Sequence, residues 1–296
     1  MQNIKTLRYL FFSLRPKHWI KNLFIFLPLI FGKKLFSFPE NVETAFAFFI
    51  FSLAASCAYL INDVWDYKKD KIHYAKRLRP IASGKITLKT AMIFALIIFF
   101  LSVSFAFMLN TSFGLIILIY LAFNGLYSKF LKEIMIIDVF CIGFFFLLRV
   151  IAGGVVASVE LSSWVILITF LLALFLGFNK RRQELIFLGR KAVTHRFVLT
   201  KYSSYFIDQM VGVLTSSIVV VYMLYTMDAK TISFFGTRNL IWSIPFVYYG
   251  IFRYLYLIHK IRRDGEPTRI LLSDKPMQLN LLLWIIVCVG IIYFKV

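Results

Sequence analysis

Nine apolar segments, each close to the length of a membrane-spanning helix, constrain this chain more than any other feature. A spanning helix needs about 20 mainly apolar residues, because the hydrocarbon core of a bilayer is about 30 Å thick. The segments are 18–34, 42–62, 89–109, 112–128, 134–154, 161–179, 206–227, 239–258 and 278–295. Lys21 and Asn22 interrupt the first of them. We therefore predict an all-α polytopic membrane protein with nine transmembrane helices, which form a single transmembrane domain over 1–296.

The composition excludes the soluble classes of protein. Hydrophobic residues make up 60% of the 296 residues and charged residues make up 16%, whereas soluble domains are about 45–50% apolar and about 25% charged. A soluble globular protein and an intrinsically disordered chain are both excluded. The three cysteines lie in apolar segments without the spacing of metal ligands, so we expect reduced packing residues at Cys57, Cys141 and Cys288.

The basic residues predict the orientation in the membrane. With the N-terminus placed in the cytoplasm, 27 of the 34 Lys and Arg residues fall on the cytoplasmic side of the nine predicted helices, and 5 fall on the opposite side. The positive-inside rule favours this orientation. We therefore expect a plasma (inner) membrane protein with a cytoplasmic N-terminus and a C-terminus on the opposite face. Long hydrophilic loops also lie on the cytoplasmic side, and we expect the functional loops to be 62–88 and 179–204.

The second predicted helix ends in a motif with several acidic residues. Polar residues recur there at spacings of four, four, three and four, at Asn62, Asp66, Asp70, His73 and Arg77. This spacing places them on one face of a continuous helix. Carboxylates so arranged can hold Mg²⁺ together with the phosphates of a substrate. We therefore predict catalytic, metal-binding residues at Asp63, Asp66 and Asp70, although a solvated helix with internal Asp–Lys pairs is the alternative.

Basic and amide side chains near this motif, and in two other stretches, are candidates for phosphate binding. Arginine can bind phosphate oxygens with two parallel hydrogen bonds. The predicted phosphate-binding residues are Lys17, Lys21, Asn22, Asn62, His73, Lys76, Arg77, Arg79, Lys129, Lys180, Arg181 and Arg182. Two alternatives stay open: an ordinary positive-inside flank for Lys17 and Lys21, and an interfacial anchor for Lys129.

The motif N-D-x-x-D-x-x-x-D, from Asn62 to Asp70 at the end of the second of nine helices, resembles that of the UbiA superfamily of intramembrane prenyltransferases. The resemblance implies nine helices around a central cavity, in which Mg²⁺ holds a diphosphate. Typical members carry a second D-x-x-x-D motif after the sixth helix, but this chain reads N-K-R-R-Q-E from Asn179 to Glu184. We interpret the change as a carboxylate pair replaced by a basic cluster that suits an anion.

Five stretches are similar to one branch of that superfamily, the decaprenyl-phosphate phosphoribosyltransferases. They are LRPKHWIKN at 14–22, DKIHYAKRLRPIASGKI at 70–86, YSKFLKE at 127–133, DVFCIGFFFLLRVIAGG at 138–154 and FNKRRQEL at 178–185. The last departs from the K-R-Y-x-E-L pattern of the branch. The resemblance implies Mg²⁺-dependent transfer of 5-phosphoribose from phosphoribosyl diphosphate to a polyprenyl phosphate at the cytoplasmic face, for cell-envelope biosynthesis. The implied partners are these substrates and membrane lipids, with no nucleic acid.

Two other functions compete with this interpretation. One is a prenyltransferase that joins a polyprenyl diphosphate to an aromatic or quinone precursor. The other is a transporter, whose charges tend to lie at broken helices near the bilayer midplane. Arg149 lies inside the fifth predicted helix, with Asp138 three turns earlier on the same face. We leave open whether Arg149 is a structural residue or a functional one.

Overall fold

The computed structural model describes residues 2–72, 76–188, 197–260 and 267–295. The chain forms two units. Unit 1 consists of Met1–Leu29, Leu35–Lys132 and Leu148–Glu160, and unit 2 consists of Ile30–Lys34, Glu133–Leu147 and Leu161–Val296. Each unit holds its own clusters of buried apolar side chains.

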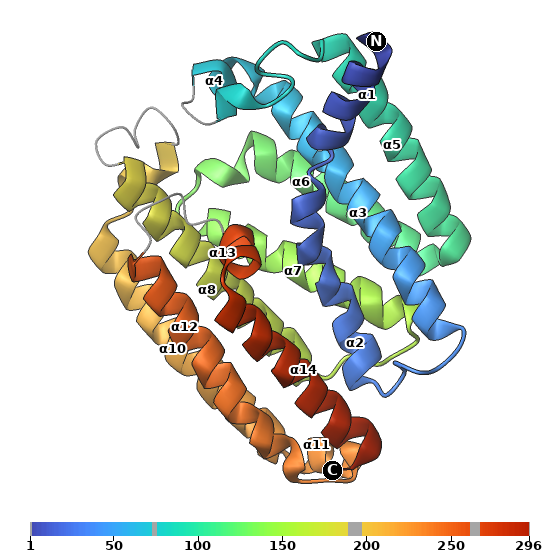
Figure 1. Ribbon diagram of the computed structural model, residues 1–296, viewed down its shortest axis with the longest axis vertical. Helices are drawn as coiled ribbons and strands as arrows, with labels where there is room; N and C mark the ends of the chain where they lie inside the picture. Colours follow the sequence, from blue (N-terminus) through green and yellow to red (C-terminus); the bar gives the residue numbers. More distant parts are fainter. Residues whose placement is uncertain (1, 73–75, 189–196, 261–266, 296) are drawn as a thin grey trace. The chain divides into compact units, whose positions relative to one another are not determined.

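Unit 1 is built around a long helix, α3, with which α5 runs side by side (Figure 1). Its helices are α1 (Gln2–Ser13), the 3-10 helix η1 (Pro16–Ile25), most of α2 (Phe26–Phe31), α3 (Glu40–Trp65), α4 (Tyr67–Ile72), the 3-10 helix η2 (Lys76–Leu78), α5 (Leu88–Leu109), α6 (Thr111–Lys129), most of the 3-10 helix η3 (Leu131–Glu133) and the second half of α7 (Ile137–Val156). Its core holds Leu60, Ile81 and Ala95, which are almost fully buried.

Unit 2 is built on two helix pairs, α8 with α10 and α12 with α14. Its elements are the first half of α7, α8 (Ser163–Leu188), η5 (Phe197–Lys201), α10 (Ser204–Met227), α11 (Ala229–Phe235), η6 (Asn239–Ser243), α12 (Ile244–Lys260), α13 (Pro267–Ser273) and α14 (Lys275–Phe294). Phe175, Ile207 and Tyr254 lie in its larger cluster of buried side chains.

Eight helices in the described part are long and apolar enough to cross a membrane. They confirm eight of the nine predicted spans, so the protein is an integral membrane protein, but the count of nine is not confirmed. The first predicted span, 18–34, is instead η1 followed by the short helix α2. A 3-10 helix rises about 2.0 Å per residue and an α-helix about 1.5 Å, so these two elements together extend about 29 Å. That length is close to the thickness of the hydrocarbon core.

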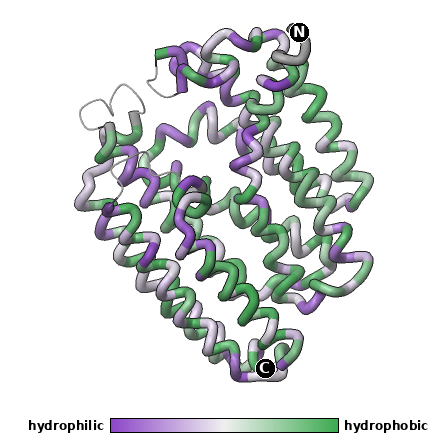
Figure 2. The backbone as a smooth tube through the Cα atoms, viewed as in Figure 1, coloured by the Kyte–Doolittle hydropathy of each residue, from purple (hydrophilic) through white to green (hydrophobic). Residues whose placement is uncertain are grey.

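Polar residues at the ends of the apolar runs set where the long helices begin. Thr87, Asn110, Ser203 and Asp274 are the N-caps of α5, α6, α10 and α14, and each side chain accepts a hydrogen bond from the backbone N–H three residues on. Such caps satisfy donors that have no partner inside the helix. In Figure 2 the body of α5 is hydrophobic, and hydrophilic residues gather at the end of unit 1 that carries α4.

Gly153 in α7 allows a close approach of two segments within unit 1. A Cβ atom at this position would overlap the backbone carbonyl of Ile25 at the end of η1. Backbone atoms cannot move aside as a flexible side chain does, so only glycine fits without a shift of η1 or α7. Gly153 therefore sets the packing of these elements.

Candidate functional site

The acidic motif does not form the continuous helix that its spacing predicts. α3 ends at Trp65, and Asp66 adopts φ −86° and ψ 7°. An α-helical residue has ψ near about −42°, so the chain changes direction at Asp66 before α4 begins at Tyr67. The prediction that the whole motif shares one helix face is therefore wrong. His73 lies outside the described residues, and its predicted role stays a prediction.

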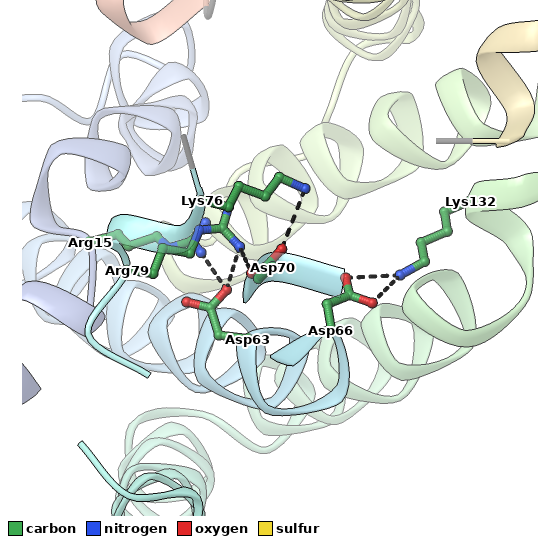
Figure 3. Close-up of polar contacts among 7 residues, drawn as sticks. All are labelled: Arg15, Asp63, Asp66, Asp70, Lys76, Arg79 and Lys132. Atoms are coloured by element: carbon green, nitrogen blue, oxygen red, sulfur yellow. Dashed lines mark hydrogen bonds and ion pairs between the residues drawn. The ribbon is translucent and has the colours of Figure 1, made fainter. Parts of the chain in front are cut away.

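Asp63 and Asp70 are joined by a single arginine (Figure 3). The Nη1 atom of Arg79 donates to Asp63 Oδ1 at 2.8 Å and to Asp70 Oδ2 at 2.6 Å. Arg15 also donates to Asp63 Oδ1, and Lys76 Nζ lies 3.8 Å from Asp70 Oδ1. Asp63 and Asp70 are only 3% and 2% exposed. The structure thus gathers two buried carboxylates and three cations.

Asp66 turns to a different partner because of the break in the helix. Lys132 in η3 donates to both carboxylate oxygens of Asp66 at 3.0 Å. The three predicted aspartates therefore form two neighbouring ion-pair groups within unit 1, Asp63 with Asp70 and Asp66 with Lys132 (Figure 3). These contacts also bring together three segments that the charge pattern assigns to one side of the membrane: the start of η1, the 62–88 loop and the link between α6 and α7.

The environment of Asp70 opposes its ionisation. Burial raises the pKa of Asp70 above its ordinary value, while Arg79 and Lys76 lower it in part. Loss of water favours the neutral form of a carboxyl group, and nearby cations favour the charged form. The carboxylate of Asp70 therefore depends on its cations, or on another cation in their place, to remain charged.

Two residues of this site, Arg15 and Lys132, are absent from the predicted phosphate-binding set. Arg15 adopts a left-handed backbone with φ 54°, and its guanidinium lies 5.0 Å from the centre of the Tyr59 ring. A left-handed non-glycine residue costs about 1–3 kcal/mol and tends to occur at functional sites. Arg15 lies in the basic stretch 14–22, 48 residues along the chain from its partner Asp63. Lys132 lies in the basic stretch 127–133, 66 residues from its partner Asp66.

Several predicted phosphate-binding residues do not join the acidic cluster. Lys17, Arg77 and Lys129 are exposed, and the ammonium of Lys129 lies over the ring of Phe130. Lys21 lies 3.5 Å from His18. Asn62 is half-buried. Their roles stay predictions.

Asn22 and Arg149 form a buried polar contact inside unit 1. Arg149 Nε donates to Asn22 Oδ1 at 2.7 Å, and Asn22 Nδ2 donates to Ser52 Oγ at 2.8 Å. Arg149 Nη2 also donates to Tyr120 Oη at 3.2 Å, and its guanidinium lies 5.0 Å from the centre of the Phe51 ring. These partners satisfy a buried charge. Arg149 therefore has hydrogen-bond partners within unit 1, and the predicted phosphate-binding role of Asn22 stays a prediction.

Two arginines of the basic cluster in unit 2 are paired with carboxylates. α8 continues to Leu188 instead of ending near 179, so Lys180, Arg181 and Arg182 are helical. Arg181 is 1% exposed, and it donates to Asp138 Oδ2 and to Glu184 Oε2, both at 2.6 Å.

Arg182 in the same cluster is paired with Asp208. Both arginines thus have a carboxylate partner in unit 2, and their predicted role in binding an anion stays a prediction. Lys180 is half-buried, and its role stays a prediction.

The donor set at Asp63 and Asp70 fits a divalent cation. Arg79 Nη1 contacts an oxygen of each carboxylate, so the two carboxylates are close neighbours, and carboxylate oxygens are ligands that Mg²⁺ prefers. In the described part of the chain, no group of three or more His, Cys, Asp or Glu side chains could hold a metal ion. Mg²⁺ is usually held by one or two carboxylates with substrate phosphates and water, and Asp63 with Asp70 suffices for that.

The fold and the site define the class of this protein: an integral membrane protein with an acidic motif at the end of α3. The model of the UbiA prenyltransferase family matches residues 25–264. The chain belongs to that family.

Comparison with known proteins agrees with this assignment. The chain is 32% identical over 277 residues to a decaprenyl-phosphate phosphoribosyltransferase of Mycobacterium tuberculosis, which covers 92% of this chain and 90% of that protein. It is 31% identical to the protein of the same name from Corynebacterium glutamicum, over 95% of this chain and 86% of that protein. Among solved structures, a UbiA homolog from Archaeoglobus fulgidus bound to GPP and Mg²⁺ matches with a TM-score of 0.70 and 22% identity, over 97% of this chain and 99% of that one. At that identity the likeness shows the fold.

Proposed function

We propose that this enzyme transfers 5-phosphoribose from phosphoribosyl diphosphate to a polyprenyl phosphate, in a reaction that depends on Mg²⁺. The observation that carries the proposal is the similarity to two decaprenyl-phosphate phosphoribosyltransferases over at least 92% of the chain. We also propose that the acidic motif and the N-terminus face the cytoplasm and that the C-terminus lies on the opposite face of the plasma membrane. The charge pattern supports this orientation.

The chemistry needs little acid–base catalysis. The bond between C1 of the ribose and the diphosphate oxygen breaks, and the diphosphate leaves with the electron pair. A bond forms between C1 and an oxygen of the lipid phosphate, which is already ionised at pH 7, so no proton has to be removed. The enzyme therefore contributes position and the neutralisation of charge.

The site of unit 1 offers groups for each of these tasks. Asp63 and Asp70 would hold Mg²⁺, which supplies charge neutralisation at the leaving diphosphate when it is bound. Arg79 and Arg15 lie next to these carboxylates, and they would bind the diphosphate oxygens. Asp66 and Lys132 form the adjacent ion pair, which we propose as the boundary of the donor site.

The phosphate of the acceptor lipid has two candidate lysine ligands. In unit 2, the half-buried Lys180 is one candidate, because the sequence predicts that it binds phosphate. Lys17 is exposed near the start of η1 and is a second candidate.

A second function is a prenyltransferase reaction, in which a polyprenyl diphosphate is joined to an aromatic or quinone precursor. The observation in favour of this second function is that the matching family is named for prenyltransferases. Against it, the described part of α8 and η5 carries no second acidic motif, because the residues from Asn179 to Glu184 are mainly amide and basic. The common feature of the two reactions is a diphosphate leaving group.

A transfer assay with two substrate pairs separates the two functions. Purified protein in detergent with Mg²⁺ receives labelled phosphoribosyl diphosphate with a polyprenyl phosphate in one reaction, and a polyprenyl diphosphate with 4-hydroxybenzoate in the other. We expect labelled lipid in the first reaction only, and its loss when EDTA is added. Product in the second reaction alone would refute the proposed function and establish the prenyltransferase.

A further inference from the structure

We propose that Arg79 competes with the metal ion for Asp63 and Asp70, so that the metal enters the site only together with a diphosphate. The inference rests on the proposed function, in which diphosphate is the leaving group. It deepens that function, because the donor then binds as its metal complex and Arg79 controls the order of binding.

The first support is the position of one atom. Arg79 Nη1 lies 2.8 Å from Asp63 Oδ1 and 2.6 Å from Asp70 Oδ2. A metal ion that took the same two oxygens as ligands would need the place that this nitrogen holds. The guanidinium nitrogen and the metal ion cannot occupy that place together. Arg79 therefore has to move before a metal ion can take these two oxygens as ligands.

The second support is the balance of charge. Arg15, Arg79 and Lys76 place three positive charges on the two negative charges of Asp63 and Asp70. A divalent cation added alone would increase the net positive charge of this site. Asp63 and Asp70 are only 3% and 2% exposed, so this added charge would be poorly screened. A diphosphate brings negative charge, and its oxygens offer the released arginine the paired hydrogen bonds that guanidinium groups favour.

The third support is the number of ligands. Within the ranges that the structure describes, the protein has no group of three or more potential metal-binding side chains. Asp66, the remaining member of the motif, is bound to Lys132 instead. Mg²⁺ requires an octahedral set of oxygens and takes the missing ones from water and substrate phosphates. The described carboxylates alone therefore make a weak metal site, and the diphosphate would complete it.

The test is a titration of the full-length protein in detergent with Mn²⁺, which replaces Mg²⁺ and whose free concentration is read by electron paramagnetic resonance. The titration is made with and without inorganic diphosphate. Free diphosphate in solution also binds Mn²⁺. The double variant Asp63→Asn, Asp70→Asn measures this background, which is subtracted. In the wild-type protein we expect diphosphate to tighten Mn²⁺ binding at least about tenfold, within the usual range of coupling between two ligands.

Variants of arginine identify the residue that couples the two ligands. Arg79→Gln is expected to bind Mn²⁺ without diphosphate at least about fivefold more tightly than the wild type, and to gain less from diphosphate. Arg8→Gln is the matched control, because Arg8 is exposed in unit 1 and lies over the ring of Phe12, and it should behave as the wild type.

Two results would overturn the inference. One is a wild-type Mn²⁺ affinity that diphosphate does not change, a measurement that needs no variant and so does not depend on how Arg79→Gln folds. The other is a folded Arg79→Gln protein that binds Mn²⁺ alone no more tightly than the wild type. Inorganic diphosphate is common to both candidate reactions. Coupling without phosphoribosyl transfer would therefore refute only the proposed function, and transfer without coupling would refute only this inference.

Discussion

Replacement of Asp138 by asparagine tests whether the basic cluster of unit 2 is a structural ion-pair network. Asp138 is fully buried, and it accepts hydrogen bonds from Arg181 at 2.6 Å and from Tyr202 at 2.8 Å. Asp138→Asn keeps the size of the side chain but removes its charge. The loss of one partner from a buried ion pair costs about 3–5 kcal/mol. Because Glu184 still pairs with Arg181, we expect the lower end, about 3 kcal/mol.

The matched control is Asp208→Asn, which removes the carboxylate from the neighbouring Arg182. The side chain of Asp208 is 44% exposed, and an exposed ion pair contributes only about 0–1 kcal/mol. The assay is thermal unfolding of each variant in detergent, followed by tryptophan fluorescence.

The expected shifts of the two variants differ clearly. A domain of about 150–250 residues loses about 2–4 °C of Tm for each kcal/mol, so Asp138→Asn should lower Tm by about 6–12 °C and Asp208→Asn by about 4 °C at most. Equal Tm values for the two variants would refute the reasoning, and the cluster would then be available to an anion.

Three further perturbations test the fold. Gly153→Ala should destabilise the protein by about 1–3 kcal/mol through overpacking against η1. The control Gly290→Ala in α14, where a Cβ meets nothing within 4 Å, should not destabilise it. Equal unfolding temperatures for the two variants would contradict the packing argument. Arg149→Met should cost about 1–3 kcal/mol because it leaves buried acceptors without a donor, and an unchanged unfolding temperature would show that Arg149 is dispensable for stability. Hydrogen bonds from Arg253 lower the pKa of Asp274, so this pair stabilises the protein fully above the ordinary aspartate pKa of about 3.9 and loses its effect as the pH falls through the lowered value. The difference in Tm between the wild type and Asp274→Asn should therefore be constant from pH 6 to pH 5 and shrink below pH 4, and a difference that grows on acidification would contradict this sign.

The membrane-spanning helices could be predicted from the sequence because their cause is local. A run of about 20 apolar residues has to be helical in a bilayer, since every backbone polar group needs a partner within the segment. The predicted segment 89–109, for example, differs from the observed α5 by one residue at its start. The first span was harder to predict, because Lys21 and Asn22 lie in a 3-10 helix of ten residues, and such long 3-10 helices are uncommon.

The site was predicted only in part, because its partners come from distant segments. The acidic motif and Arg79 could be found, since they are close together in the sequence. The bend at Asp66 could not be read from the spacing, which assumes a continuous helix. The contact of Lys132 with Asp66 spans 66 residues, so no local pattern indicates it.

The end of the sixth predicted helix was placed too early, at 179, for a similar reason. Three consecutive basic residues after an apolar run are typical of a loop at the membrane surface. α8 instead continues through Arg181, because Asp138, 43 residues earlier, supplies a buried carboxylate for it. A charge can lie inside a helix of a membrane protein when its partner is also inside, and only the tertiary structure reveals that partner.

The most direct test of the central claim is the rate of diphosphate release from phosphoribosyl diphosphate, measured with and without a polyprenyl phosphate in saturating Mg²⁺. For the wild type we predict that release requires the lipid phosphate and the metal, with one phosphoribosyl lipid formed for each diphosphate. For Asp70→Asn we predict a rate at least about 100-fold lower, the usual loss when a group that stabilises charge in the transition state is removed. Near-normal release by Asp70→Asn, or release by the wild type without the lipid acceptor, would contradict the account.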